Sequence, residues 1–430
     1  MTPASGSTSP DAITVLYADN SYTFGGAINA LAHLLSAVRG VRPVVMSAQP
    51  LEVLHDLFPN MHSHHWRVRL NWVHDRFDRR VTSWPGFQAG PLLSGWKKLR
   101  ALGWLALIDV PEAMRVLRLA RANGVQLVHL NNGVDGMLSA LIAAKLLRLP
   151  VIAHARGPVA TEGVARAYAG MADHWIAVSG EMARNLRAAG VDESRTTVVH
   201  DAIDLTQFTQ SPAPSGLRDE LGIPEDARLF GVFARIVDWK GIREFVHAAR
   251  IVIQRVPAAH AIVVGDASDG SEEYYRGVIH LAAELGIADR VHFTGFREDV
   301  ADLMRMCDVV VHSSIVPEPF GMTVIEAMAT GTPVVAANAG GPTEIIPSSE
   351  YGLLVDPTVP EELADAVVQF LEDPALAAYV GANGARRIRE HFSAERYARD
   401  VEAVYAQVLP DPASASARLN HADVRPMHSR

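Results

Sequence analysis

The sequence of 430 residues contains a single cysteine, Cys307. One thiol excludes an intrachain disulfide framework and also the cysteine-rich metal sites in which several thiolates bind one ion. Because Cys307 closely precedes an apolar segment, we expect it to lie in the core. The sequence also lacks HExxH, GxSxG and Walker A patterns and any cluster of cysteine with histidine. Zinc hydrolases, serine hydrolases and P-loop proteins are therefore unsupported.

Positive charge is scarce, since 39 lysines and arginines stand against 48 aspartates and glutamates and the net charge is −9. General nucleic-acid binding needs an electropositive surface, so we expect no nucleic-acid partner. The longest uncharged stretch near the centre, residues 327–343, is too rich in Gly, Pro and Thr for a transmembrane helix. Residues 1–11 lack the basic and apolar regions of a signal peptide. We expect a cytoplasmic protein.

What the sequence does contain is apolar material for more than one core, because 49% of the residues are hydrophobic and the length favours two domains. Residues 13–17 predict a buried strand, and the glycine pair Gly25 and Gly26 precedes a helical pattern that leads to a strand at 41–46. Such a βαβ unit implies a parallel sheet. Its glycine pair would let backbone N–H groups approach a phosphate or sugar, or would simply form a tight turn.

The alternation of strands and helices continues in two halves. We expect further strands at 125–130, 150–154, 173–179 and 197–200, then at 229–234, 261–264, 290–295 and 308–311, and a final strand at 334–337. Residues 209–216 are rich in Ser, Pro and Gly and predict a linker. We therefore predict an N-terminal domain over 13–208, a C-terminal domain over 217–391, a last helix within 392–409, and disordered ends at 1–12 and 410–430.

Residues 317–336 predict a loop and a helix that follow a buried strand. Gly321 permits a tight turn, and the helix begins near Thr323 and ends before Gly331. The start of a helix offers free N–H groups to an anion, and Glu318 and Glu326 flank this one. A carboxylate beside an anion site suits a ligand with both phosphate and hydroxyl groups. The alternative is that Glu326 only complements the helix dipole and Glu318 is solvated.

Cationic side chains follow other predicted strands. Arg235 and Lys240 stand at the crossover after the strand at 229–234, where a diphosphate would fit between an arginine fork and a lysine point charge. His154 and Arg156 follow the strand at 150–154, and ligands of parallel sheets bind at that edge. The alternatives are solvated surface cations and a structural histidine.

Residues 61–104 hold five of the seven tryptophans, and eight basic residues against two acidic ones give this segment a local charge of +6. Tryptophan together with lysine and arginine is typical of contact with an anionic membrane surface or a lipid-linked substrate. The alternative is that the tryptophans pack in the core and the basic residues are solvated.

The motifs, taken in their order, resemble one known family. They are Arg235 with Lys240-Gly241, Val264-Gly265-Asp266, Phe293-Thr294-Gly295, and the Glu318/Glu326 pair with seven residues between. Together with the segment 172–208 they resemble the retaining GT-B glycosyltransferases of family GT4, over roughly residues 13 to 405. The resemblance implies two Rossmann-like domains facing across a cleft, with the last helix crossing back to the first domain. It also implies a hexosyl-type glycosyltransferase (EC 2.4) that uses a nucleotide-diphosphate sugar and needs no metal or other cofactor.

The resemblance assigns roles to particular residues. Glu326 would hold the ribose of the donor, and Glu318 would hold hydroxyls of the transferred sugar. Arg235 and Lys240 would bind the diphosphate and stabilise the leaving group. With His154, which would lie by the reacting sugar, they form the implied catalytic set.

The remaining implied contacts involve the donor alone. The Phe296-Arg297 turn would meet the base, and Gly25 and Gly26 would approach the donor from the first domain. The implied segment at the helix start comprises Phe320, Gly321, Met322, Thr323 and Val324, of which the last four would offer backbone N–H groups.

Other functions stay open at this point. A nucleotide-sugar epimerase or a sugar phosphorylase of the same fold would share the diphosphate site but need no glycan or lipid-linked acceptor. A third possibility is a catalytically silent binding or scaffold protein with this fold, which a failure to bind any nucleotide diphosphate would favour. The silent protein is disfavoured because four side chains that would bind the donor are intact, namely Arg235, Lys240, Glu318 and Glu326. The basic segment at 61–104 slightly favours a transferase at the inner face of the membrane.

Overall fold

The computed structural model describes residues 12–21, 25–59, 61–66, 91–134, 136–159, 168–208, 216–268 and 270–409. The chain forms two compact units. Unit 1 comprises Met1–Ala177, Ala183–Thr197 and Ala398–Arg430, and unit 2 comprises Val178–Met182 and Val198–Tyr397. The chain thus enters unit 2 earlier than the predicted boundary at 208. The predicted disordered ends and most of the predicted linker at 209–216 lie outside the described residues.

Unit 1 is built on a parallel sheet in the order β3-β2-β1-β4-β5-β6-β7. The strands are β1 (Ile13–Asp19), β2 (Val41–Ser47), β3 (His62–His65), β4 (Leu127–Leu130), β5 (Val151–Ala155), β6 (His174–Ala177) and β7 (Thr196–Val198). The central strands are buried on both faces, which explains their nearly continuous apolar sequences.

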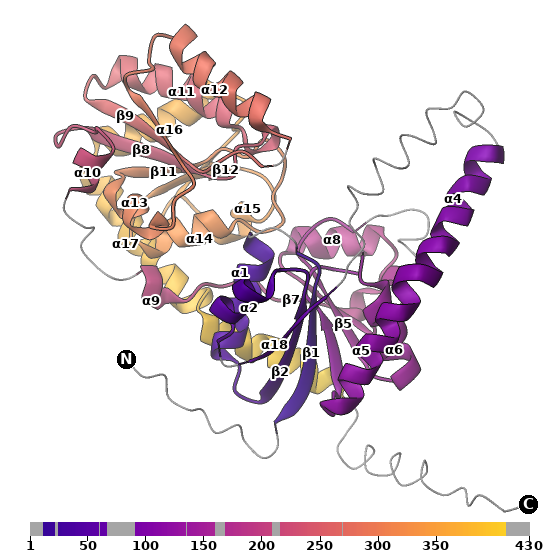
Figure 1. Ribbon diagram of the computed structural model, residues 1–430. Coiled ribbons are helices and arrows are strands. Elements are labelled where there is room, and N and C mark those ends of the chain that lie inside the picture. Colours follow the sequence, from indigo (N-terminus) through magenta and orange to yellow (C-terminus); the bar gives the residue numbers. More distant parts are fainter. Residues whose placement is uncertain are drawn as a thin grey trace, which may run out of the picture. The chain divides into compact units, whose positions relative to one another are not determined.

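Helices cover both faces of this sheet. Figure 1 shows α1 (Gly26–Ala37) and α18 (Ala394–Val408) on one side, and α5 (Val110–Ala122) and α6 (Leu138–Leu147) on the other. The remaining helices of unit 1 are α2 (Leu51–Leu57), α4 (Pro91–Trp104), the π-helix η2 (Leu105–Asp109), η3 (Glu193–Arg195) and α8 (Gly180–Ala188), whose first residues belong to unit 2.

The last helix, α18, returns to unit 1, as the resemblance implied. The hydroxyl of Tyr405 lies 2.6 Å from Nδ1 of His129 in β4 and 3.0 Å from the hydroxyl of Tyr17 in β1, all in the buried interior. Nearer the surface, the carboxylate of Glu402 accepts hydrogen bonds from the backbone N–H groups of residues 39 and 40. These contacts fix the C-terminal helix against the first sheet.

Unit 2 repeats the architecture around a parallel sheet in the order β10-β9-β8-β11-β12-β13. The strands are β8 (Arg228–Phe233), β9 (Ala259–Val264), β10 (Val291–Gly295), β11 (Val309–His312), β12 (Val334–Ala337) and β13 (Leu353–Val355). Its core gathers Phe230, Phe245, Val263 and Phe370. Cys307 is buried as expected, and burial raises the pKa of its thiol.

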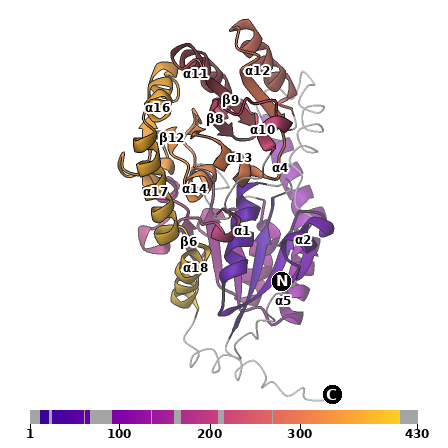
Figure 2. The ribbon, with the colours of Figure 1, turned by 90° about the vertical axis from the view of Figure 1, so that its left-hand side faces the viewer.

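The helices of unit 2 surround this second sheet, and Figure 2 shows α16 and α17 beside one another in the view turned by 90°. They are α9 (Leu205–Phe208), α10 (Leu217–Glu220), η4 (Asp238–Lys240), α11 (Ile242–Arg255), α12 (Glu272–Glu284), α13 (Val300–Met306), α14 (Met322–Ala329), α15 (Pro342–Ile345), α16 (Pro360–Glu372) and α17 (Pro374–His391).

Two edge strands differ from the sequence-based expectation. β12 was expected to be the final strand, but β13 follows it and pairs with it in parallel. β13 has only three half-buried residues, too few to produce a clear apolar pattern. β3 has the sequence His-Ser-His-His, so it joins β2 through backbone pairing rather than through an apolar face. Short or polar edge strands are those that periodicity misses.

The tryptophan-rich segment 61–104 is described only over residues 61–66 and 91–104. Trp66 is buried, so for this residue the core interpretation is correct. Within α4, by contrast, Leu99 and Leu102 are exposed. No helix in the described ranges combines the length and the apolar character needed to cross a bilayer.

Candidate active site

The turn between β8 and α11 is pressed against the loop that follows β11. Gly241 has φ +66°, and a Cβ at this position would lie 1.9 Å from the carbonyl oxygen of Ser313. The hydroxyl of Ser313 donates to the carbonyl of Lys240 at 2.9 Å, and the N–H of Ile315 donates to the carbonyl of Trp239 at 3.0 Å. Only glycine permits this approach, which brings Lys240 beside the second loop.

The carboxylate of Glu318 is the meeting point of the two loops. Its Oε1 accepts hydrogen bonds from Nζ of Lys240 at 2.5 Å, from Nε2 of His312 at 2.7 Å and from the hydroxyl of Ser314. Burial opposes ionisation, but His312 and Lys240 more than offset it and hold the pKa of Glu318 well below its ordinary value. Glu318 is therefore ionised at neutral pH.

Backbone contacts fix the residues on either side of Glu318. The N–H of Gly341 donates to the carbonyl of Glu318 at 2.9 Å, and the hydroxyl of Ser179 donates to the carbonyl of Pro319 at 2.6 Å. A Cβ on Gly341 would lie 2.1 Å from the carbonyl oxygen of Phe320. These contacts hold the loop rigidly at the point where α14 begins.

Helix α14 begins after Gly321, which has φ +118° and ψ 59°. The first N–H groups of a helix have no partner within it, so those of Met322 and Thr323 are available at this end. The side chain of Thr323 turns back and its hydroxyl donates to the carbonyl of Phe233 at 3.3 Å. The predicted helix start after a glycine turn is present in the structure, and its role as an anion site stays a prediction.

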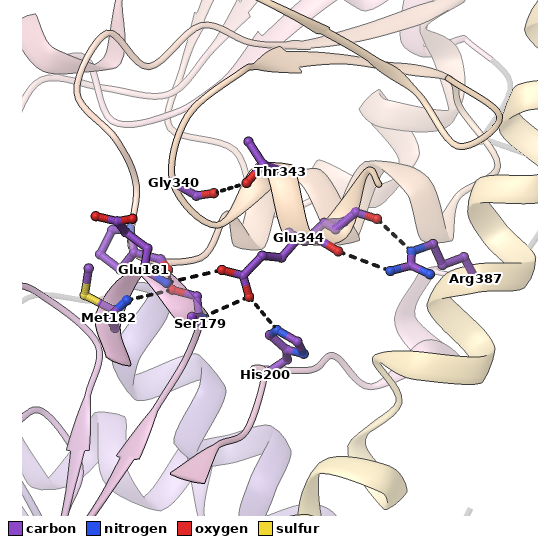
Figure 3. A network of polar contacts seen from close by, with 11 residues as sticks. Ser179, Glu181, Met182, His200, Gly340, Thr343, Glu344 and Arg387 are labelled. Atoms are coloured by element: carbon purple, nitrogen blue, oxygen red, sulfur yellow. Dashed lines mark hydrogen bonds and ion pairs between the residues drawn. The ribbon is translucent and has the colours of Figure 1, made fainter. Parts of the chain in front are cut away.

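Glu344 anchors the segments around Gly180 and His200, and Figure 3 shows its contacts. Its carboxylate accepts hydrogen bonds from the N–H groups of Gly180 at 3.0 Å and Glu181 at 3.3 Å, and Nε2 of His200 lies 3.0 Å away. Burial opposes ionisation, yet His200 and the two N–H groups keep the pKa of Glu344 below its ordinary value. Arg387 donates to the carbonyl of Glu344, which completes the anchor.

The aromatic ring of Phe320 belongs to this anchor. Its centroid lies 5.7 Å from that of His200 and 5.9 Å from that of Phe392, and its side chain is buried. Phe320 therefore supports the loop from inside the unit. Sequence reasoning missed Glu344 and His200, because only the fold brings these distant positions together.

Glu326 and Arg235 carry the site's remaining charges. Glu326 is half-buried, and burial raises the pKa of its carboxyl to about 7 although the charge of Lys240 acts in the opposite direction. Arg235 is exposed. Among the residues that the structure describes, the side chains of Glu326 and Arg235 form no hydrogen bond or ion pair with the protein. Both are therefore available to a ligand.

The two side chains of the predicted base-binding turn, Phe296 and Arg297, have different surroundings. Phe296 is 67% exposed. The guanidinium of Arg297 is bound by both carboxylate oxygens of Asp299, at 2.8 and 2.6 Å, and by Glu220 at 2.6 Å. Its charge is thus already satisfied by the protein, which leaves the backbone and the Phe296 ring as the free parts of this turn.

In unit 1, the predicted residues lie at the carboxyl end of the sheet. Gly25 caps α1, and Gly26 is its first residue. His154 is buried at the end of β5, where burial and the charge of Arg156 hold the pKa of its ring well below the ordinary value. His154 is therefore neutral. The roles of Gly25, Gly26 and His154 toward a donor stay predictions.

A buried polar network surrounds this end of unit 1, and the sequence did not single it out. The carboxylate of Asp19 accepts hydrogen bonds from Ser21, Ser47 and Asn131, and Arg156 donates to the carbonyl of Asn131 at 2.9 Å. Burial outweighs these bonds and raises the pKa of Asp19. The available signal was that polar residues end β1 and β2 and directly follow β4.

Comparison with known proteins agrees with this geometry. The family model described as "Glycosyl transferases group 1" matches residues 216–387, and the model described as "Glycosyltransferase Family 4" matches residues 82–207. The chain belongs to glycosyltransferase family 4. The resemblance to family GT4 is thereby confirmed, and retention of configuration stays a prediction.

Two curated relatives illustrate the similarity. The lipopolysaccharide core biosynthesis mannosyltransferase LpsB of Rhizobium meliloti is 31% identical over 239 residues, which cover 55% of this chain and 66% of LpsB. The D-inositol 3-phosphate glycosyltransferase of Streptomyces avermitilis is 35% identical over 223 residues, which cover 50% of this chain and 48% of that protein. The chain spans between about half and two thirds of the length of such relatives.

Solved structures support the GT-B fold of this family 4 member. HepE of Anabaena, in complex with UDP-glucose, is 25% identical with a TM-score of 0.72, and the match covers 92% of this chain and 100% of HepE. Sucrose-phosphate synthase of Thermosynechococcus elongatus has a TM-score of 0.67 at 23% identity, over 91% of this chain and 98% of that chain. The predicted fold class is therefore confirmed.

We predict that Gly241→Ala destabilises unit 2 more than Gly286→Ala does. The two glycines have similar φ values of +66° and +69°, but only Gly241 faces a backbone atom, while Gly286 has nothing within 4 Å. The left-handed conformation alone costs about 1–2 kcal/mol in both variants. The clash with Ser313 adds about 1–3 kcal/mol more in Gly241→Ala. Urea unfolding measures both, and equal losses would contradict the close packing of the two loops.

Proposed function

We propose that this protein is a retaining glycosyltransferase that moves a sugar from a nucleotide-diphosphate sugar to a hydroxyl group of a glycan, a lipid-linked acceptor or a small molecule. The observation that carries the proposal is the ionised Glu318 carboxylate, paired with Lys240 beside the start of α14. Positive charge, helix N–H groups and a carboxylate then lie within one loop system. This combination suits a ligand with a diphosphate and sugar hydroxyls.

The diphosphate is the leaving group of the proposed reaction. As the bond between the sugar carbon and the phosphate oxygen breaks, negative charge develops on the diphosphate. Lys240, the unpaired Arg235 and the N–H groups of α14 are the groups proposed to stabilise this charge. In this proposal these fixed cations and dipoles carry out the step, and a divalent metal is not required.

The sugar and the nucleoside are proposed to contact the two carboxylates. Glu318, as an ionised acceptor, binds hydroxyls of the transferred sugar. Glu326 binds the ribose, for which its lack of a protein partner within the described residues leaves both oxygens available. The related HepE was crystallised with UDP-glucose, which supports a nucleotide sugar as the donor.

A glycosyltransferase is favoured over an epimerase or a phosphorylase of the same fold. The names of the relatives LpsB and D-inositol 3-phosphate glycosyltransferase both describe transfer to an acceptor. Product analysis distinguishes the three, because a transferase joins the sugar to an acceptor hydroxyl, a phosphorylase forms a sugar phosphate, and an epimerase joins the sugar to no acceptor.

The proposed acceptor side includes peripheral contact with an anionic membrane. Five large apolar side chains are exposed along the continuous helical segment α4-η2-α5, and basic residues occur near them in the sequence. The apolar residues are Leu99, Leu102, Leu107, Val110 and Met114, and the basic residues are Lys97, Lys98 and Arg100. An exposed apolar stripe with basic neighbours is typical of helices that lie on anionic bilayers.

The proposed activity predicts that Lys240→Ala and Glu326→Ala each lower turnover by about 10²–10³-fold, because each removes a charged contact to the donor. The donor is first identified by a thermal-shift screen of UDP-, GDP- and ADP-sugars, since a ligand of the native state raises its melting temperature. Lys145→Ala is the matched control, because Lys145 forms only a half-exposed ion pair with Asp173 in unit 1. Near-wild-type rates in both site variants would refute the assignment.

The raised pKa of Glu326 predicts that donor affinity increases with pH. The raised pKa of Glu326 contributes to the folding stability of the free protein. This contribution is fully present below the ordinary carboxyl pKa of 4.5 and is lost as the pH rises through about 7. Only the ionised form accepts both ribose hydroxyls, so affinity rises about tenfold between pH 6 and pH 8. Calorimetry with a nucleotide sugar, whose phosphodiester does not titrate in this range, measures the change. In Glu326→Gln the slope disappears, and a slope that persists would assign it to another group.

The exposed leucines predict binding to anionic vesicles. Sedimentation with vesicles of phosphatidylcholine and phosphatidylglycerol should recover the protein, whereas pure phosphatidylcholine vesicles should not. The double variant Leu99→Gln/Leu102→Gln should weaken this binding at least about tenfold. Leu146→Gln, which changes an equally exposed leucine on α6, should have no effect. Equal vesicle binding by both variants would exclude α4 as the element that contacts the membrane.

A further inference from the structure

The two oxygens of the Glu318 carboxylate have different surroundings. Oε1 accepts all three side-chain hydrogen bonds, from Lys240, His312 and Ser314. Oε2 accepts none from the residues that the structure describes. Because the side chain of Glu318 is 11% exposed, a ligand hydroxyl has access to this acceptor. The carboxylate is thus held by one oxygen and offers the other.

The three donors on Oε1 are not equivalent. A diphosphate would also attract Lys240, because a diphosphate and a carboxylate are both strong anionic partners for an ammonium group. When a nucleotide sugar binds, Lys240 is shared between two anions. His312 and Ser314 have no such second partner, since the hydroxyl of Ser314 and Nε2 of His312 are both directed at Glu318.

The environment of His312 fixes how it acts. Its side chain is only 5% exposed, and its Nδ1 is buried without a hydrogen-bond partner. Nε2 lies 2.7 Å from the carboxylate, so this nitrogen carries a proton and donates it in the hydrogen bond. His312 ends β11, and Ser314 follows two residues later in the loop after the strand.

We propose that His312 and Ser314 are positioning residues that fix Glu318, so that its Oε2 accepts a hydrogen bond from one hydroxyl group of the donor sugar. This inference rests on the proposed function and extends it to the choice of sugar. A carboxylate locked at Oε1 cannot rotate to follow a hydroxyl that is missing or inverted. The enzyme therefore discriminates between sugars at the carbon whose hydroxyl meets Oε2.

The test compares the affinity of the nucleotide sugar with that of the free nucleoside diphosphate, because only the sugar meets Glu318. His312→Leu removes the donor at similar bulk, and His312→Gln keeps an N–H group near the position of Nε2. His280→Gln is the matched control, since His280 is an exposed histidine on α12 that contacts Glu284. Calorimetry measures both ligands for each protein, and a melting curve verifies folding.

His312→Leu is expected to weaken nucleotide-sugar binding about ten- to hundredfold. Binding of the nucleoside diphosphate should change less than about twofold in the same variant, because it does not contact Glu318. His312→Gln should restore the sugar-dependent part, and His280→Gln should match the wild type. If His312→Leu does not fold, Ser314→Ala carries the same comparison with the loss of a single hydroxyl.

Two outcomes are decisive in different ways. Wild-type protein that binds neither ligand would overturn the proposed function, and the positioning role with it. Wild-type protein that binds both, with the ratio of the two affinities unchanged in His312→Leu and Ser314→Ala, would overturn the positioning role alone.

Discussion

A carboxylate that is buried away from water needs hydrogen-bond donors, and one oxygen of Glu318 accepts three hydrogen bonds. The donors come from three separate positions, Lys240 in the turn after β8, His312 at the end of β11 and Ser314 in the next loop. Each of these elements must therefore hold its place for the charge to be tolerated. The local geometry of unit 2 around α14 follows from this requirement.

The glycines in these loops serve that requirement. Gly241 lets one turn touch the backbone of Ser313, and Gly341 lets another touch the backbone of Phe320. Backbone contact at this range leaves little freedom, so the donors arrive already oriented. Preorganised polar groups are also what a site needs to stabilise developing charge, since they do not have to reorganise during the reaction. The same packing thus supports the buried charge and the proposed chemistry.

Much of the architecture follows from sequence patterns, because parallel strands buried on both faces produce long apolar runs that any reader can find. The helix start after Gly321 was within reach of motif reasoning, whereas the contact between Lys240 and Glu318 was not, because it joins positions 78 residues apart in the chain. β3 and β13 were not within reach either, since a His-Ser-His-His segment and a three-residue strand have no apolar signature. Edge strands are specified by backbone pairing, which side-chain periodicity does not report.

Glu318 and Glu326 show why the chemistry of a site is harder to predict than its position. They are the same residue type in one motif with seven residues between them, yet Glu318 has a lowered pKa and Glu326 a pKa raised to about 7. The difference lies in partners from distant segments, because His312 and Lys240 donate to Glu318 while no described residue donates to Glu326. One carboxylate is thus fixed in its charged form, and the other is left for a ligand to ionise.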